Sequence, residues 1–287
     1  MYYLYLLGCI ICIASSSIFS ALFNRKNIFR GNTSNIYAFV NVVAVQLGWI
    51  ILYILDWSFD SGVLLYALAF GACYTAANIG IINAIRYGSI SLSSLFQQLS
   101  LVAVAVWGFF FWDTKFGIIT AIGLILVIVS LCLCLLNGGG NSGFSFKWII
   151  YVALSFFGNA GCSIITKTQQ MKYNGQYGAQ FMAFASLFSL VICLSMFLRT
   201  NTHNFFEVMK YSWYLPVIAG VLNVLLNLFI MRLAVSPLSP ALIYPAISVG
   251  GILVVSLTSA LAFKEKMSRR QWIGVGVGAV AVALLSL

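Results

Sequence analysis

Amide and hydroxyl side chains recur inside long uncharged stretches of this sequence, where hydrogen bonding is the chemistry that they can do. The clearest case runs from Arg86 to Val102, RYGSISLSSLFQQLSLV, in which Gln97 and Gln98 follow a group of serines. In an apolar environment such groups cost free energy unless they find a partner or face a cavity. We expect the following residues to line a substrate-binding site: Asn78, Ser94, Gln97, Gln98, Asn159, Asn223, Asn227 and Tyr244.

Helical spacing separates the faces on which these amides lie. Residues three or four apart share a face, as Asn223 and Asn227 would. Gln97 and Gln98 are adjacent and point about 100° apart, so at most one of them should face a central cavity squarely. The other would brace a neighbouring helix. Hydrogen bonds between helices, worth about 0.6 to 2 kcal/mol each, would explain both glutamines nearly as well.

Three prolines mark a second candidate segment, VSPLSPALIYPAISVGG. Ser239 suits an N-cap and Pro240 the first position of a helix, where its missing N–H costs nothing. Pro245 lies in the first turns and cannot donate to the carbonyl of Ala241, so we expect a kink. The kinked segment, with Pro240 and Pro245, is a candidate hinge or gate, or a kink that only improves packing.

Carboxylates and histidine, which most often carry acid–base chemistry, are scarce and peripheral. The single histidine, His203, and all five acidic residues lie between the uncharged stretches or at their boundaries: Asp56, Asp60, Asp113, Glu207 and Glu265. The sequence holds no nucleophile–histidine pair, metal-ligand cluster or phosphate loop. We therefore expect that the protein is not an enzyme and that it has no catalytic residues, no metal and no cofactor. A cationic substrate would be expected to meet a buried carboxylate or an aromatic cage, so the substrate should be neutral or zwitterionic.

Long uncharged stretches supply the elements that must position these side chains. Only 7% of the residues are charged, against about 25% in an ordinary soluble domain. A helix needs about 20 predominantly apolar residues to cross a bilayer. The sequence therefore predicts an all-α membrane protein with ten transmembrane helices, located in a plasma or inner membrane. The ten uncharged spans are 1–24, 31–55, 61–85, 87–112, 116–146, 148–166, 173–198, 211–231, 233–263 and 271–287.

The net charge of +10 comes from loops and helix ends, so it bears on topology and gives no sign of nucleic-acid binding. Arg86 and Arg232 lie where predicted helices end. A cation there reaches the interface and complements the helix C-terminus, an interpretation that we prefer to anion binding. Lys167 and Lys172 are assigned to the loop after the sixth helix. Counted over all loops, the positive-inside rule puts both termini outside.

The sequence divides near its midpoint into two halves that resemble each other weakly. The segment NGGGNSG, from Asn137 to Gly143, leaves five predicted helices on each side. AIRYGSISLSSLFQQLSLV in the first half matches IMRLAVSPLSPALIYPAIS in the second, which pairs Arg86 with Arg232. Because each copy has an odd number of helices, the second is inverted relative to the first, a common plan for secondary transporters. The predicted divisions are a first five-helix repeat at 1–137, a Gly-rich linker at 138–146 and a second five-helix repeat at 147–287.

Asp113 and Glu265 close the fourth and ninth predicted helices, and KEKMSRRQWIGVGVGAVAVALL places Gln271 before a glycine-rich last helix. With the 5+5 arrangement, these features resemble the EamA-like transporters of the drug/metabolite transporter (DMT) superfamily over essentially the whole chain. The chain departs from the family pattern at Asp113, where glutamate is frequent, and by lacking a glycine before Glu265. The resemblance implies a basket of ten helices around a cavity lined largely by helices 1, 3, 4, 6, 8 and 9. It also implies export or exchange of small polar metabolites, and cytoplasmic termini.

Together these features predict a secondary transporter, as an exporter, exchanger or facilitator, of a small neutral or zwitterionic polar metabolite such as an amino acid. The expected partners are the solute and the lipid bilayer, with no nucleic acid. The alternative is a non-transporting membrane protein, either a lipid-processing enzyme or flippase component, or a scaffold subunit. Gly274 and Gly278 permit close backbone approach. Packing within the chain is the preferred interpretation of this stripe and dimerisation is the alternative, so we expect a monomer or a homodimer.

Overall fold

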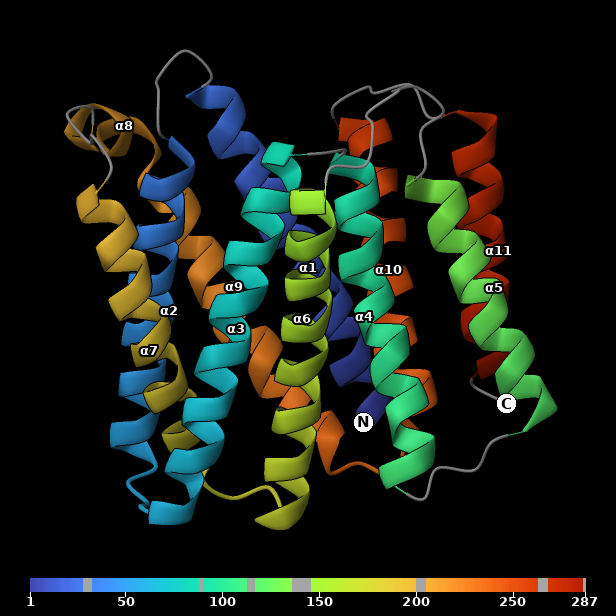
Figure 1. Cartoon of the computed structure of the whole chain (residues 1–287), viewed down its shortest axis with the longest axis horizontal. Helices are drawn as coiled ribbons and strands as arrows, with labels where there is room; N and C mark the ends of the chain where they lie inside the picture. The colour runs from blue at the N-terminus through green and yellow to red at the C-terminus, as the bar shows by residue number, and fades with distance from the viewer. Residues whose placement is uncertain are drawn as a thin grey trace. The chain divides into compact units, whose positions relative to one another are not determined.

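The computed structural model is built from α-helices (Figure 1). It describes residues 1–27, 33–87, 90–112, 117–135, 146–199, 205–262 and 268–285, and these residues contain no β-strand. In lipid, a helix satisfies its backbone hydrogen bonds within its own segment, which is why long apolar runs adopt it. The long helices are α1 (Tyr2–Lys26), α2 (Thr33–Leu55), α3 (Ser61–Tyr87), α4 (Ile90–Phe111), α5 (Ile118–Leu135), α6 (Phe146–Lys172), α7 (Gly178–Arg199), α9 (Tyr214–Ala234), α10 (Pro240–Ala262) and α11 (Arg269–Leu285).

Each uncharged span contains one long helix, but two features differ from the sequence expectation. The helix α6 continues to Lys172, so Lys167 lies inside a helix and its assignment to a loop was wrong. A short helix that the sequence analysis did not predict, α8 (Phe205–Ser212), lies between α7 and α9. Its first turn holds Glu207 and its last turn Lys210, charges that complement the helix dipole. A search for long uncharged spans cannot find an element that is this short and charged.

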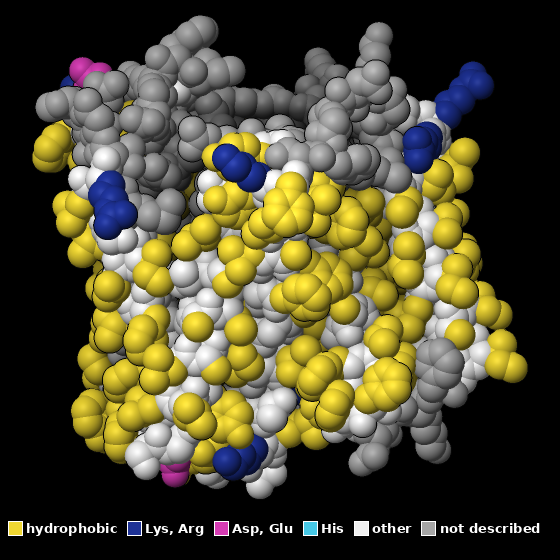
Figure 2. Space-filling model, viewed as in Figure 1, with side chains coloured by type: hydrophobic (Ala, Val, Ile, Leu, Met, Phe, Trp, Pro, Cys, Tyr) yellow, Lys and Arg dark blue, Asp and Glu magenta, His cyan; other side chains and the backbone are white. Residues whose placement is uncertain are grey.

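In the described part of the chain, six helices are long and apolar enough to cross a membrane: α1, α2, α3, α6, α7 and α9. Shorter apolar helical stretches are Leu95–Phe111, Ile118–Leu133 and Pro240–Val254. Large apolar side chains lie uncovered on the helices, such as Leu65 at 72% and Phe157 at 71% exposure. Figure 2 shows hydrophobic side chains along the helix flanks and charged ones near the helix ends. Because such a surface suits lipid, the protein is a membrane-embedded helical protein with several passes.

Contacts divide the chain into two compact units, and each unit draws on both halves of the sequence. Unit 1 comprises Met1–Leu6, Cys73–Ile165 and Ser236–Leu287, and unit 2 comprises Leu7–Ala72 and Thr166–Val235. The predicted repeats were delimited by the Gly-rich segment near the midpoint of the sequence and therefore have other boundaries. Of the predicted linker, 138–146, all but the last residue lies outside the described residues.

Unit 1 is organised by helix pairs, α4 with α10 and α5 with α11, and α10 also packs against α5 and α11. Its apolar core includes Leu95, Leu131 and Val249. Elsewhere in the unit, α3 and α6 approach each other closely because the contact residues are small. A Cβ on Gly158 of α6 would lie 2.6 Å from the backbone nitrogen of Ala77 on α3. The first segment of α6 is thereby fixed beside α3.

The glycine stripe of α11 faces the interior of unit 1. The Ser130 hydroxyl of α5 donates a hydrogen bond to the Gly274 carbonyl at 2.7 Å. A Cβ on Gly278 would lie 2.6 Å from Ser130 Oγ and 2.7 Å from Val249 Cγ1, whereas a Cβ on Gly276 would meet open space. The expectation that Gly274 and Gly278 pack within the chain is confirmed.

Unit 2 is built around α2, which packs against α7 and α9. The helix α1 packs against α9 where Gly8 lies against the ring of Phe229. A Cβ on Gly8 would lie 2.7 Å from the nearest atom of that ring. The short helix α8 is held by Val208, which shares an apolar cluster with Phe23 of α1. At the lower end of this unit in Figure 1, the ends of α2, α6, α7 and α9 lie near one another.

Candidate functional site

Three polar residues in unit 1 join α4 to α6, and we call them the Gln97 cluster: Gln97, Ser100 and Asn159. The Asn159 amide donates to Ser100 Oγ at 2.6 Å and to the Gln97 carbonyl at 3.3 Å. The Ser100 hydroxyl donates to the same carbonyl at 2.5 Å. Within the described part of the chain, the side-chain amide of Gln97 makes no hydrogen bond, and it is only half-buried. It is therefore open to a ligand.

Gln98, one position further along α4, is bonded to another helix. Ser248 of α10 donates its hydroxyl to Gln98 Oε1 at 3.1 Å and to the Gln98 carbonyl at 3.3 Å. The adjacent glutamines therefore differ as expected, since Gln98 braces a neighbouring helix and the Gln97 amide remains unbonded. A role in binding solute stays a prediction for both.

The start of α10 has the cap that the sequence predicts. Ser239 Oγ accepts a hydrogen bond from the Ala241 amide at 3.1 Å, and Pro240 is the first helical residue. Pro245 lies inside the helix, where it has no N–H to offer the Ala241 carbonyl. The hinge or gate assigned to Pro240 and Pro245 stays a prediction. The neighbouring Tyr244 is 3% exposed, packs against Val104 and Ala160, and donates its hydroxyl to the Ser163 carbonyl at 3.4 Å.

The remaining predicted site residues make no described hydrogen bond to the Gln97 cluster, or their side chains lie outside the described residues. Asn78 donates to the Tyr74 carbonyl of its own helix at 2.8 Å. Asn223 and Asn227 are in unit 2, where the Asn227 amide donates to Asn223 Oδ1 at 3.0 Å, so their expected common face is confirmed. The side chain of Ser94 lies outside the described residues. A single cavity that unites these residues stays a prediction.

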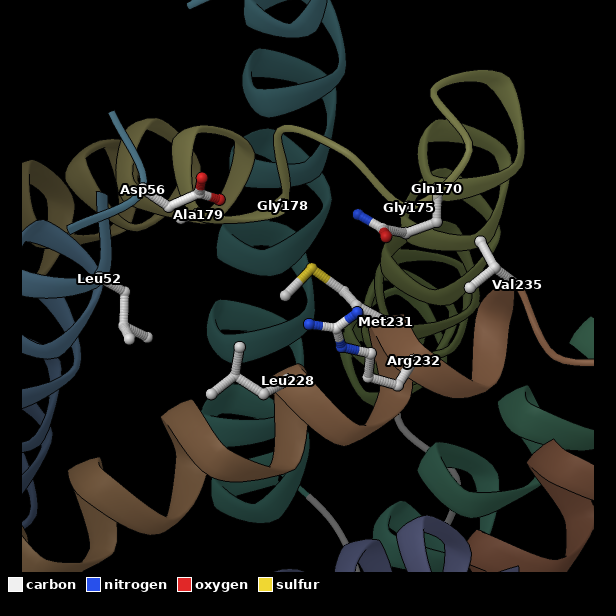
Figure 3. Close-up of a pocket in the computed structure, with 10 residues that line it drawn as sticks. All are labelled: Leu52, Asp56, Gln170, Gly175, Gly178, Ala179, Leu228, Met231, Arg232 and Val235. Carbon is white, nitrogen blue, oxygen red and sulfur yellow. The ribbon is translucent and has the colours of Figure 1, made fainter. Parts of the chain in front are cut away.

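Unit 2 contains a pocket of about 210 Å³ that the sequence analysis did not anticipate (Figure 3). Three polar side chains reach it from three helices or their ends: Asp56 follows α2, Gln170 belongs to α6 and Arg232 to α9. The remaining lining is apolar or glycine: Leu52, Gly175, Gly178, Ala179, Leu228, Met231 and Val235. The sequence analysis preferred an interfacial cation to anion binding for Arg232, because nothing in the sequence pairs position 232 with position 56.

Lys167 is a second residue that the sequence analysis misplaced. Its side chain is 4% exposed, and its ammonium group donates to the carbonyl of Ala234, the last residue of α9, at 2.9 Å. A cation is favourable at the negative end of a helix dipole. The sequence does hold a signal for this placement, because no turn-forming residue follows Lys167 until Asn174 and Gly175.

A hydrogen-bonded group ties the α2–α3 loop to the α6–α7 turn. The Gln180 amide donates to the Asp60 carbonyl at 2.8 Å, and Gln180 Oε1 accepts from the Asp60 backbone amide at 2.9 Å. The Tyr173 hydroxyl donates to Asp60 Oδ1 at 3.2 Å. Partial burial, followed by this hydrogen bond, raises the pKa of Tyr173 above its ordinary value. These bonds fix the two connections that flank the pocket.

Comparisons with known proteins support the fold without assigning an activity. No family model matches the chain. A protein of Haemophilus influenzae described as uncharacterized is 25% identical over 279 residues, which cover 94% of this chain and 93% of that protein. A solved structure described as the crystal structure of a protein has a TM-score of 0.72 at 12% identity, covering 99% of this chain and 95% of that one. This likeness shows that the helical arrangement is that of a known fold.

Proposed function

We propose that this chain is an EamA-like transporter of the DMT superfamily that moves a small neutral or zwitterionic polar solute, such as an amino acid, by alternating access. The observation that carries the proposal is the Gln97 cluster. It lies well inside α4 and α6, is built from neutral groups, and leaves the Gln97 amide unbonded within the described chain. In a membrane protein, an unbonded amide at such a position is costly unless a cavity or a solute satisfies it.

The pairing of helices supports the inverted repeat on which alternating access would depend. With α8 set aside, α1 to α5 correspond in order to α6, α7, α9, α10 and α11. Corresponding helices pack together in three cases, α2 with α7, α4 with α10 and α5 with α11. The contact of α1 with α9 has a counterpart in that of α6 with α3. A two-fold related duplication produces such reciprocal contacts.

The chemistry of the cluster supports a neutral or zwitterionic solute. The Gln97 amide offers two donors and one acceptor oxygen, and the bonds of Asn159 and Ser100 hold the adjacent backbone in place. Asp56 and Asp60 lie at helix ends, and Glu207 belongs to the short helix α8. Asp113 and Glu265, the residues of the family resemblance, lie outside the described residues. Among the described residues, α4 and α6 therefore carry amides and hydroxyls in their interior but no carboxylate.

The test is solute counterflow in proteoliposomes that contain the purified full chain. The probes are leucine, serine, glutamine, uracil, glucose and a tetraalkylammonium cation. We expect flux above empty liposomes for a neutral or zwitterionic probe, and a rate at least about tenfold lower in Gln97→Leu, because the solute loses hydrogen bonds worth about 1.4 kcal/mol or more. Val106→Leu, at an exposed position of the same helix, is the matched control and should transport normally.

Two outcomes would contradict the proposal. Normal flux in Gln97→Leu would remove the cluster from the transport path. The second outcome is that no probe shows any flux, although thermal unfolding shows that the wild-type protein and the Gln97→Leu variant are equally folded. That result would favour the lipid-processing or scaffold alternative. Conversion or translocation of a labelled phospholipid in the same liposomes would then identify the lipid-processing alternative.

A further inference from the structure

We propose that the pocket of unit 2 is a separate binding site for a free α-amino acid with an apolar side chain, held by its two charges between Arg232 and Asp56. The inference rests on the proposed function only for the class of solute. The residues that carry it belong to α2, α6, α7 and α9 and to the segments next to them, and none belongs to the Gln97 cluster. The two sites can therefore be tested separately.

The pocket presents one charge of each sign without pairing them. Figure 3 shows the Arg232 guanidinium and the Asp56 carboxylate directed toward the pocket from different sides. Neither side chain forms a hydrogen bond or ion pair with any described residue. Arg232 lies in the last turn of α9, and Asp56 follows the last residue of α2. A solute with a carboxylate and an ammonium group would satisfy both, the carboxylate through the two parallel N–H donors of the guanidinium.

Gln170 adds a neutral acceptor that is held rigidly in place. Its side chain is 2% exposed, and its Nε2 donates to Gln169 Oε1 at 2.6 Å. The Gln169 amide in turn donates to the Gln176 carbonyl at 3.3 Å. This chain of bonds leaves Gln170 Oε1 without a donor among the described residues, on a side chain that lines the pocket. This oxygen is not enclosed by protein atoms, so it is open to the pocket, where an ammonium group can donate a hydrogen bond to it.

Three features of the surrounding structure shape and fix the site. The turn between α6 and α7 places Asn174 and Gly175 at positive φ, 50° and 80°. At Gly178, a Cβ would lie 3.0 Å from Met231 Sδ and 3.2 Å from Gln170 Nε2, so any side chain there would intrude on the lining. Lys167 binds the carbonyl end of α9, two residues beyond Arg232. The polar groups are thus mounted on a fixed frame.

Size and lining select a small solute with an apolar side chain. A volume of about 210 Å³ lies below the roughly 300–1,000 Å³ of pockets for drug-sized ligands. The walls between the charges are aliphatic or thioether side chains: Leu52, Leu228, Met231 and Val235. An aliphatic amino acid matches both the charges and these walls. The headgroup of phosphatidylethanolamine shares the pairing of an anion with an ammonium group, so the experiment must separate the two.

The test measures equilibrium binding to the purified full chain in detergent, with three ligands that share the leucine side chain and carry different charges. Leucine carries both charges, leucinamide lacks the carboxylate and N-acetylleucine lacks the ammonium group. We expect wild-type protein to bind leucine at least about tenfold more tightly than either analogue. In Arg232→Gln the preference for leucine over leucinamide should vanish, and in Asp56→Asn the preference for leucine over N-acetylleucine should vanish.

Each variant is its own folding control, because it must still discriminate at the charge that it retains. Lys172→Gln removes a cation from an exposed position near the end of α6 and should leave all three affinities unchanged. The inference is wrong if leucine, valine, alanine and methionine all fail to bind. It is also wrong if both variants weaken all three ligands alike, or if only Gln97→Leu affects leucine binding, in which case the proposed function survives. Dihexanoyl phosphatidylethanolamine that binds in place of the amino acids would identify a lipid headgroup instead.

Discussion

The two units differ in the polar groups that they contain. In unit 1 the described polar groups at the interfaces of α4, α6 and α10 are neutral, and most of them form hydrogen bonds between helices. In unit 2, charged groups lie where the helices end. Gln97 and Asn159 lie well inside their helices, while Asp56 and Arg232 lie at helix ends. The difference follows from the solvent. An unbonded amide in lipid costs roughly 2–7 kcal/mol, but a charge costs more and stays near the interface or beside a helix terminus.

Lys167 shows how unit 2 tolerates a buried charge. It lies five residues before the end of α6 and faces the carbonyl end of α9, so a helix dipole and a hydrogen bond offset its desolvation. Unit 1 has no comparable charge among its described residues and depends on close packing of small residues and on neutral bonds. Three substitutions test this contrast.

The largest effect should come from crowding unit 1. Gly278→Leu would force a side chain into Ser130 Oγ and Val249 Cγ1, and we expect it to lower the free energy of unfolding by about 3 kcal/mol. The measurement is equilibrium unfolding of the purified protein in mixed micelles. Gly276→Leu, two residues away and facing open space, should change stability by less than about 0.5 kcal/mol. A stable Gly278→Leu protein that has lost a dimer would show instead that this stripe serves association between chains.

The next effect should come from unit 2. Lys167→Met keeps an unbranched apolar stem that is one atom shorter, but leaves the Ala234 carbonyl without its ammonium donor. We expect a loss of about 1.5–3 kcal/mol in the same unfolding assay. Lys172→Met, at an exposed position whose ammonium lies 5.3 Å from the ring of Tyr66, should cost about 1 kcal/mol or less. If Lys167→Met were as stable as the wild-type protein or more stable, burying the charge would cost at least as much free energy as its interactions contribute.

The smallest effect concerns the neutral brace of unit 1. A double-mutant cycle of Gln98→Leu and Ser248→Ala should give a coupling energy of about 0.6 kcal/mol, and at most about 1.7. Pairing Gln98→Leu with Ser130→Ala, whose hydroxyl bonds to α11, should give additive changes within about 0.5 kcal/mol. Coupling as large as the effect of Lys167→Met would remove the distinction between neutral and charged interfaces.

Much of the helical architecture follows from the sequence because the charges of this chain lie at or near the ends of its apolar runs. The rule failed where a charge is buried, at Lys167, since a one-dimensional search treats every charge as an end. It also missed α8, which is held to unit 2 through Val208 rather than by a long apolar run. The cap at Ser239 and Pro240 was predictable because capping depends on neighbouring residues.

The binding residues were harder to predict. The sequence indicated that one glutamine of the pair would brace another helix, but the contact of Gln98 with Ser248 decided which one. It could not pair Asn159 with Ser100, which are 59 residues apart. It also gave no reason to bring Asp56, Gln170 and Arg232 together, since each looks like an ordinary residue of a helix end.

By itself, the sequence determined the solvent of this protein, the location of its long helices and the neutral character of the polar groups inside α4. These properties depend on composition and on contacts within one helix turn, both of which are written locally. Only the tertiary structure decided which amide remains unbonded, which helix end receives Lys167 and where two opposite charges meet one pocket. Such features arise when helices distant in sequence pack side by side, because close packing of their surfaces, rather than local propensity, sets which side chains meet.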